Sequence, residues 1–156
     1  MTEQAEPVTE TEVAVQLEEI EVDAPRVGII MGSKSDMDVM DGAASVLRDA
    51  GVHHEVRVMS AHREPEIVAE YCASARMRGL RVIIAGAGLS AALPGVAAAH
   101  TDLPVIGVPL SSRLSAMGGL DAILSVLQMP PGVPVAGVGL DNAKNAGHLA
   151  LRILRS

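Results

Sequence analysis

Short apolar runs, most of them rich in β-branched residues, recur along the chain and alternate with segments of helical spacing. Because the runs are apolar throughout rather than at every second position, they are typical of strands buried on both faces of a parallel sheet. The strands expected on this pattern are Val27–Met31, Glu55–Met59, Arg81–Ala85, Val105–Val108 and Val133–Val138. The expected helices are Asp36–Ala50, Pro65–Arg78, Pro94–His100, Leu120–Leu127 and Asn142–Leu154.

This alternation predicts an α/β protein, a three-layer αβα sandwich with a doubly wound parallel sheet of about five strands. Right-handed crossovers bring the loops that follow the strands to one edge of the sheet, where ligands of such folds usually bind. Candidate chemistry is therefore expected in the loops after the strands.

Charge divides the chain into two parts. Residues 1–25 hold 8 of the 19 acidic residues and no Lys or Arg. We expect this segment to be a disordered acidic tail ahead of a single domain spanning residues 26–156. The alternative is that Val13–Ile20 forms a transient helix or docks on a partner. With 156 residues and an apolar share of 49%, the chain is long enough for one packed domain.

Several classes of protein and site are disfavoured by composition. The chain has no basic run and no stretch of 18 apolar residues, which argues against charge-driven nucleic-acid binding and against a membrane span. It begins without the basic start and apolar run of a signal peptide, so we expect a cytoplasmic location. The single Cys72 excludes an intramolecular disulfide and a multi-cysteine zinc site.

The loop after the first expected strand contains Gly32, Ser33, Ser35 and Asp36 and leads into a helix. Glycine permits a sharp turn, while two hydroxyls, a carboxylate and the free N–H groups of a helix start can bind a phosphate or a sugar. The alternative is an ordinary helix cap made by Ser35 or Asp36. The motif is not a P-loop, because its glycine spacing differs.

The loop after the second expected strand contains Ser60, Ala61, His62 and Arg63. A histidine beside an arginine offers a proton donor or acceptor near neutral pH together with a fixed cation for an anionic group. The alternative is a capping Ser60 with solvated His62 and Arg63. The position at a strand end favours a functional role.

Gly86, Ala87 and Gly88 follow the third expected strand and begin a formal match to the G-x-G-x-x-G/A pattern of dinucleotide-binding proteins. The match follows the third strand rather than the first and lacks the expected downstream acid, which disfavours an oxidoreductase. We expect a glycine-rich loop whose backbone amides approach a ligand. The Ser- and Gly-rich segment 109–119 is expected to form a mobile cover over the site, or merely a surface connection.

Six motifs in order resemble the PurE family of 5-(carboxyamino)imidazole ribonucleotide mutases, which act in de novo purine synthesis. They are Met-Gly-Ser-Lys-Ser-Asp at 31–36, Ser-Ala-His-Arg at 60–63, Ala-Gly-Ala-Gly at 85–88, Leu-Pro-Gly at 93–95, Pro-Val-Ile-Gly-Val-Pro at 104–109 and Gln-Met-Pro-Pro-Gly-Val-Pro-Val at 128–135. The resemblance implies a flavodoxin-like subunit, a homo-octamer with active sites shared between subunits, a ribonucleotide substrate, and no metal or organic cofactor.

The same resemblance implies a role for each motif. His62 would be the catalytic acid and base, and Arg63 would bind the phosphate of the nucleotide. The remaining residues would contact the substrate: Gly32, Ser33, Ser35 and Asp36 at the ribose and phosphate, Ser60 and Ala61 at the nucleotide, and Gly86, Ala87 and Gly88 at the imidazole and carboxylate.

Two departures from the family pattern keep other functions open. Ala92 occupies a position where the family usually has a histidine, and Met37 replaces the usual aromatic residue. The alternatives are a carboxylase or decarboxylase of another nucleotide, similar to the carboxylase of nickel-pincer cofactor synthesis, and a catalytically idle nucleotide-binding homologue. A third is direct carboxylation of aminoimidazole ribonucleotide, although those enzymes typically have Lys after the histidine, where this chain has Arg63.

Overall fold

The computed structural model describes residues 24–156, so the predicted acidic tail lies, apart from residues 24 and 25, outside the described part of the chain. The strands are β1 (Val27–Met31), β2 (His54–Val58), β3 (Val82–Gly88), β4 (Val105–Leu110) and β5 (Ala136–Gly137). The helices are α2 (Met37–Asp49), α3 (Pro65–Ser74), α4 (Leu93–Ala99), α5 (Leu120–Leu127) and α6 (Ala143–Arg155), with the short 3₁₀ helices η1 (Lys34–Asp36) and η2 (Ala116–Gly119).

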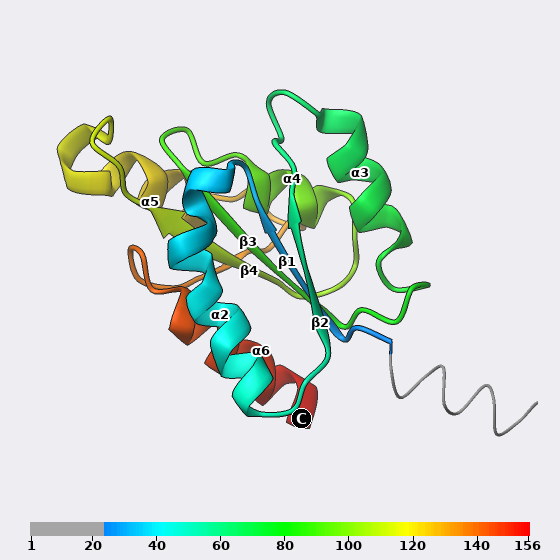
Figure 1. The fold of residues 1–156 in the computed structure, drawn as a ribbon. Coiled ribbons are helices and arrows are strands. Elements are labelled where there is room, and N and C mark those ends of the chain that lie inside the picture. Colours follow the sequence, from blue (N-terminus) through cyan, green and yellow to red (C-terminus); the bar gives the residue numbers. More distant parts are fainter. Residues whose placement is uncertain (1–23) are drawn as a thin grey trace, which may run out of the picture.

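All five strands are parallel and lie in the order β2-β1-β3-β4-β5, which is the flavodoxin-like order. Helices α2 and α6 cover one face of the sheet, and α3, α4 and α5 cover the other (Figure 1). The predicted three-layer sandwich is therefore confirmed. The central strands are buried on both faces, which is why they read as continuous apolar runs.

The core is built from aliphatic and small side chains. On one face, Met40 and Leu47 of α2 pack with Ile29 of β1 and Ile106 of β4. Helices α2 and α6 approach closely through Gly147, where an added Cβ would lie 3.0 Å from the carbonyl oxygen of Ala43. Small residues thus replace aromatic bulk in a chain that contains a single aromatic residue.

Only β1 has the expected bounds; β2 and β4 differ by one or two residues, and the differences at β3 and β5 are larger. Strand β3 continues through Gly86 to Gly88, so these residues are part of a strand rather than of a loop after it. The last strand is reduced from the expected 133–138 to Ala136–Gly137 at the edge of the sheet. Pro134 has no N–H to donate to a neighbouring strand, which is consistent with the short pairing.

The carboxyl ends of β1 and β3 lie side by side where the strand order reverses, and the connections from these strands run to opposite faces of the sheet. Folds of this class bind ligands at such a point. Within residues 24–156, no helix is both long and apolar enough to span a membrane.

Candidate active site

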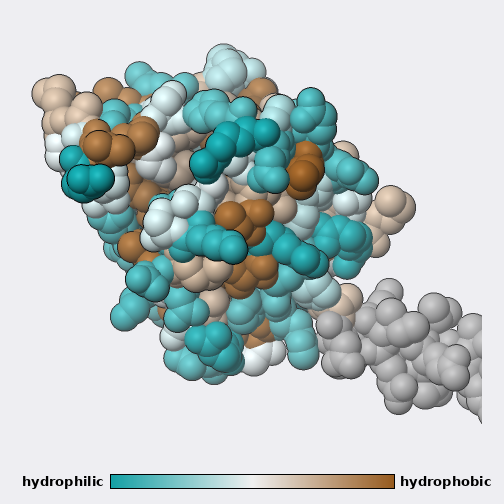
Figure 2. All heavy atoms as spheres, turned by 45° about the horizontal axis from the view of Figure 1, so that its top comes forward, coloured by the Kyte–Doolittle hydropathy of each residue, from teal (hydrophilic) through white to brown (hydrophobic). Residues whose placement is uncertain are grey.

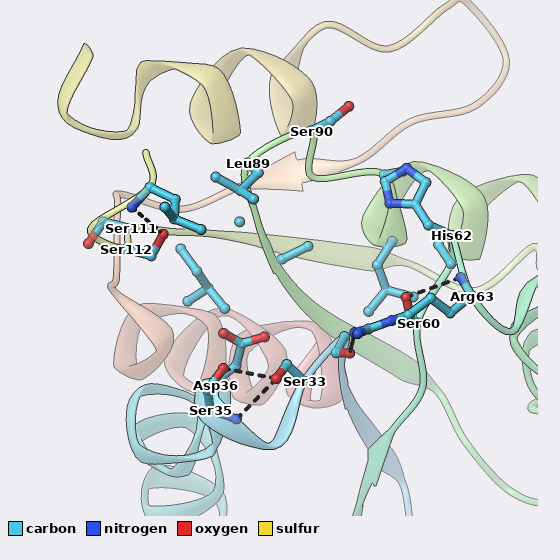
Figure 3. Close-up of a pocket in the computed structure, with 18 residues that line it drawn as sticks. Ser33, Ser35, Asp36, Ser60, His62, Arg63, Leu89, Ser90, Ser111 and Ser112 are labelled. Carbon is cyan, nitrogen blue, oxygen red and sulfur yellow. Dashed lines mark hydrogen bonds between the residues drawn. The ribbon is translucent and has the colours of Figure 1, made fainter. Parts of the chain in front are cut away.

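A cavity of about 310 Å³ opens at the carboxyl ends of the strands, and the loops after β1, β2, β3 and β4 all contribute to its wall (Figure 3). Ten of the eleven residues predicted from the sequence line it: Gly32, Ser33, Ser35, Asp36, Ser60, Ala61, His62, Arg63, Ala87 and Gly88. The structure therefore brings together residues that are up to 56 positions apart in the sequence.

The loop after β1 presents two hydroxyls and a carboxylate to the cavity. The Ser33 Oγ accepts a hydrogen bond from the Ser35 backbone N–H at 3.2 Å and lies 2.9 Å from the Ser35 Oγ. Asp36 is half-buried, and this burial raises the pKa of its carboxyl group, partly offset by a backbone hydrogen bond from Ser33. The expected cap by the side chain of Ser35 or Asp36 is not what the structure shows. The Ser33 side chain caps η1, and the Asp36 side chain makes no capping hydrogen bond to α2. Ser33 also lines the cavity, so its capping role does not exclude ligand binding.

The loop after β2 is held against the loop after β1 by Arg63. The Arg63 Nη2 donates a hydrogen bond to the Gly32 carbonyl oxygen at 2.8 Å. Ser60 is buried, and its Oγ accepts a hydrogen bond from the Arg63 backbone N–H at 3.3 Å, while its carbonyl oxygen accepts one from the Glu64 N–H at 2.8 Å. These bonds fix the backbone on both sides of His62.

His62 lies on the β2–α3 side of the cavity, across from Ser33, Ser35 and Asp36 (Figure 3). Its side chain is exposed in the described chain. An imidazole in this position can exchange protons with a bound ligand whose sugar and phosphate face the loop after β1.

Gly86 is the one predicted site residue that does not line the cavity. It is buried within β3, where the Met40 thioether from α2 packs so closely that an added Cβ would overlap the sulfur. Ala87 and Gly88 do reach the cavity. A Cβ on Gly88 would lie 2.9 Å from the Leu110 carbonyl oxygen, so glycine at this position lets β3 run close to β4.

After β3 the chain turns sharply at Leu89, whose φ of 56° lies in the left-handed region that non-glycine residues seldom adopt. The turn is closed by hydrogen bonds from the Ala91 N–H to the Leu89 carbonyl and from the Ala92 N–H to the Ser90 carbonyl, at 2.9 and 2.7 Å. Leu89, Ser90, Ala92 and Leu93 line the cavity and were not among the predicted site residues. Their position directly after a buried strand is the sequence signal that could have identified them.

The segment after β4 forms the remaining wall through Leu110, Ser111, Ser112 and Leu114. It was expected to cover the site or merely to connect elements, and its side chains do line the cavity; its mobility stays a prediction. Asp141, just before α6, holds this wall in place: its carboxylate accepts hydrogen bonds from the Ser111 backbone N–H at 2.8 Å and from the Ser111 hydroxyl. Its own N–H donates to the Pro109 carbonyl oxygen at 2.8 Å.

The cavity combines one imidazole, one guanidinium, one carboxylate and several hydroxyls with an apolar part formed by Ala87, Leu89, Leu93 and Leu110. Hydroxyls, a guanidinium and a carboxylate suit a phosphorylated sugar, because each can make a directed hydrogen bond to a phosphate oxygen or a ribose hydroxyl. Within residues 24–156, no group of three His, Cys, Asp or Glu side chains is arranged to bind a metal ion.

Comparisons with known proteins agree on one family. The AIR carboxylase family matches residues 26–156. The N5-carboxyaminoimidazole ribonucleotide mutase of Pyrococcus abyssi is 59% identical over 135 residues, which cover 86% of this chain and 76% of that protein. The mutase of the same name from Mycobacterium tuberculosis is 57% identical over 130 residues, covering 83% and 74%. Among solved structures, the crystal structure of Treponema denticola PurE superposes with a TM-score of 0.73 at 35% identity, covering 84% of this chain and 80% of that one.

Proposed function

This chain belongs to the AIR carboxylase family, and we propose that the cavity at the carboxyl ends of its strands is the active site of an N5-carboxyaminoimidazole ribonucleotide mutase with His62 as proton carrier. The reaction moves a carboxylate from the exocyclic nitrogen of the imidazole ribonucleotide to a carbon of its ring, in purine biosynthesis. Relatives with 53–59% identity carry this mutase name.

The observation that carries the role of His62 is its position. The imidazole lines the same cavity as the hydroxyls of Ser33 and Ser35, on the opposite wall (Figure 3). A nucleotide whose ribose and phosphate contact the loop after β1 and Arg63 directs its base toward His62, Ala87 and Gly88. Arg63 contributes a permanent positive charge to the phosphate, and its bond to Gly32 sets the distance between the two binding loops.

In the first half of the reaction the His62 imidazolium gives its proton to the exocyclic nitrogen. The bond between this nitrogen and the carboxylate carbon then breaks, its electron pair stays on nitrogen, and carbon dioxide is released into the cavity. His62 is left neutral and the nucleotide carries a free amine.

In the second half the adjacent ring carbon attacks carbon dioxide and becomes tetrahedral, still holding its hydrogen. His62 removes this proton, which restores the aromatic ring and the imidazolium. One imidazole therefore serves as acid and then as base, and the cycle balances without a second proton donor. A cavity closed to solvent would retain the carbon dioxide between the two halves.

A direct assay tests this proposal. The purified protein is mixed with the carboxyamino nucleotide and the ultraviolet change is followed, in parallel with His62→Asn and His100→Asn. His100 is an exposed histidine that ends α4 and does not line the cavity, so it provides the matched control. We expect turnover in the wild type and in His100→Asn, and loss of turnover with retained nucleotide binding in His62→Asn.

Other outcomes would identify the alternatives. Comparable turnover in His62→Asn would refute the proton carrier. Turnover only with aminoimidazole ribonucleotide and bicarbonate would indicate a direct carboxylase, and binding without turnover would indicate an idle homologue. The same assay tests whether the site tolerates Ala92, which lines the cavity where the family usually has a histidine.

We also propose the homo-octamer with shared sites that the resemblance implies, and its support is an apolar surface beside the cavity. Four apolar side chains are exposed there: Leu114 just before η2, Met117 in η2, and Leu124 and Leu127 in α5, with Met117 83% accessible. Figure 2 shows hydrophobic side chains at the surface at the left of the molecule, over this segment. Because Leu114 also lines the cavity, a subunit packed on this surface would help to close the site.

Light scattering tests the assembly, with an expected mass about eight times the 16.1 kDa of one chain. Leu124→Glu is expected to dissociate it, whereas Glu66→Gln on the exposed start of α3 serves as a control. A monomeric wild type with full activity would refute the shared site. We place the enzyme in the cytoplasm, because a phosphorylated substrate does not cross a bilayer unaided.

A further inference from the structure

A second cavity, of about 380 Å³, lies at the amino-terminal ends of the strands, at the edge of the sheet opposite the active site. Four arginines line it, namely Arg26, Arg76, Arg78 and Arg81, together with Ala24. Arg26 directly precedes β1 and Arg81 directly precedes β3. None of these residues lines the catalytic cavity.

Arg26 and Arg81 are neighbours across the sheet. The Arg81 N–H donates a hydrogen bond to the Arg26 carbonyl oxygen at 2.8 Å, and the next residues, Val27 and Val82, are register partners. In-register residues of adjacent strands project to the same face, and the strands are about 4.8 Å apart. Two positive charges in this arrangement repel each other unless an anion lies between them.

The other two arginines already have carboxylate partners. The Arg76 Nε lies 3.0 Å from the Asp102 carboxylate, and the Arg78 Nη1 lies 2.7 Å from the Glu55 carboxylate. By contrast, neither Arg26 nor Arg81 forms an ion pair with a carboxylate of residues 24–156; the Arg81 guanidinium donates to the carbonyl oxygens of Gly79 and Leu80. The cavity therefore carries two positive charges that the described part of the chain does not neutralise.

The part of the chain that directly precedes this cavity in sequence is acidic. Residues 1–23 contain eight carboxylates and no Lys or Arg, and the next residue, Ala24, is part of the cavity wall. The Glu18 carboxylate is six residues from Ala24, which limits its distance along the chain to about 20 Å. Covalent attachment keeps the effective concentration of these carboxylates at the cavity high.

We propose that the acidic segment 1–23 binds in the arginine cavity of its own chain and pairs its carboxylates with Arg26 and Arg81. Single exposed ion pairs contribute little, but several carboxylates that exchange over two adjacent guanidiniums hold the segment through the sum of their contacts. The bound segment keeps this cationic surface from attracting the phosphate of the substrate to the wrong edge of the sheet. Binding is expected to weaken with salt, because the contacts are exposed.

Spin labelling of the full chain tests the proposal. Gln16→Cys introduces a thiol in the acidic segment for a nitroxide label. The native Cys72 is buried, which raises the pKa of its thiol to about 11 and keeps it unreactive toward the label. We expect an electron paramagnetic resonance spectrum with an immobilised component at low salt that is lost at 1 M NaCl.

Charge substitutions locate the contact. Arg26→Gln/Arg81→Gln should remove the immobilised component, while Arg48→Gln/Arg152→Gln, which changes the same charge on exposed positions of α2 and α6, should keep it. Glu18→Gln/Glu19→Gln/Glu21→Gln changes no residue of the domain, so it gives the same test if the arginine variant fails to fold. The kcat/KM of the mutase reaction should stay within twofold in all three variants.

Two results would overturn the proposal. If the labelled protein that keeps Arg26 and Arg81 gives a fully mobile spectrum at low salt, the segment does not bind. An immobilised component that survives both the arginine and the glutamate substitutions would show that the segment binds elsewhere, including on a second copy of the chain.

Discussion

Arg63→Ala is expected to weaken substrate binding more than it slows the chemical step. The guanidinium of Arg63 lines the active-site cavity, and its Nη2 donates to the Gly32 carbonyl oxygen at 2.8 Å. Alanine removes both the charge that we propose binds the phosphate and the hydrogen bond that joins the loops after β1 and β2. Hydrogen bonds to charged groups contribute about 1.5–3 kcal/mol, and the lower end applies because Arg63 is exposed. At about 1.4 kcal/mol per tenfold, KM should rise about tenfold.

Steady-state kinetics of four proteins test this reasoning. Arg63→Lys keeps the charge but loses the planar fork, so its KM should lie between the values for the wild type and Arg63→Ala. Arg152→Ala, an exposed arginine of α6, should leave KM unchanged. If Arg63→Ala keeps the wild-type KM, or if it lowers kcat alone, the guanidinium does not hold the phosphate.

One substitution at the site and a pair of substitutions in the core test the burial of Asp36 and the packing of Gly28 against Tyr71. Asp36→Asn should raise the thermal midpoint at pH 7 more than at pH 4. Burial raises the pKa of this carboxyl group above 3.8, so the stability of the wild type falls as the pH rises through the folded-state pKa. An increase in the thermal midpoint that is equal at both pH values would contradict this. Gly28→Ala should cost about 1–3 kcal/mol in the free energy of unfolding, because its Cβ would overlap the Tyr71 hydroxyl. Adding Tyr71→Phe should recover most of that loss in urea denaturation, whereas additive effects would show that the two residues do not clash.

The central strands could be predicted from sequence because burial on both faces leaves little room for polar residues. The interior of β1 and β4 is fully apolar, and both strands begin where the pattern placed them. Edge strands carry less information: Val56 and Val58 of β2 are partly exposed, and β5 retains two residues. The end of β3 was missed because glycines read as a loop, whereas Gly86 and Gly88 serve packing against Met40 and the Leu110 carbonyl.

Only the part of the candidate site that lies within short sequence motifs could be predicted. The sequence shows the hydroxyl residues of the loop after β1 and the histidine and arginine of the loop after β2 as short motifs. The parallel topology brings both loops to one edge of the sheet. The bonds from Ser111 to Asp141 join segments 30 residues apart, and no periodicity or turn signal encodes such a contact. The same holds for the hydrogen bond from Arg63 to the Gly32 carbonyl oxygen, which depends on the conformation of the Arg63 side chain between two neighbouring loops.

Tyr71 is the only aromatic residue of the chain, and this has a spectroscopic consequence. Its ring packs beside the core between α3 and the sheet, with the Arg78 guanidinium 4.6 Å from its centroid, and it does not line the active-site cavity. Absorbance near 280 nm and intrinsic fluorescence therefore come from one ring that lies outside the proposed active-site cavity. Optical changes of an imidazole substrate can be read against a nearly silent protein background, while tyrosine emission separately reports the packing of α3 during unfolding.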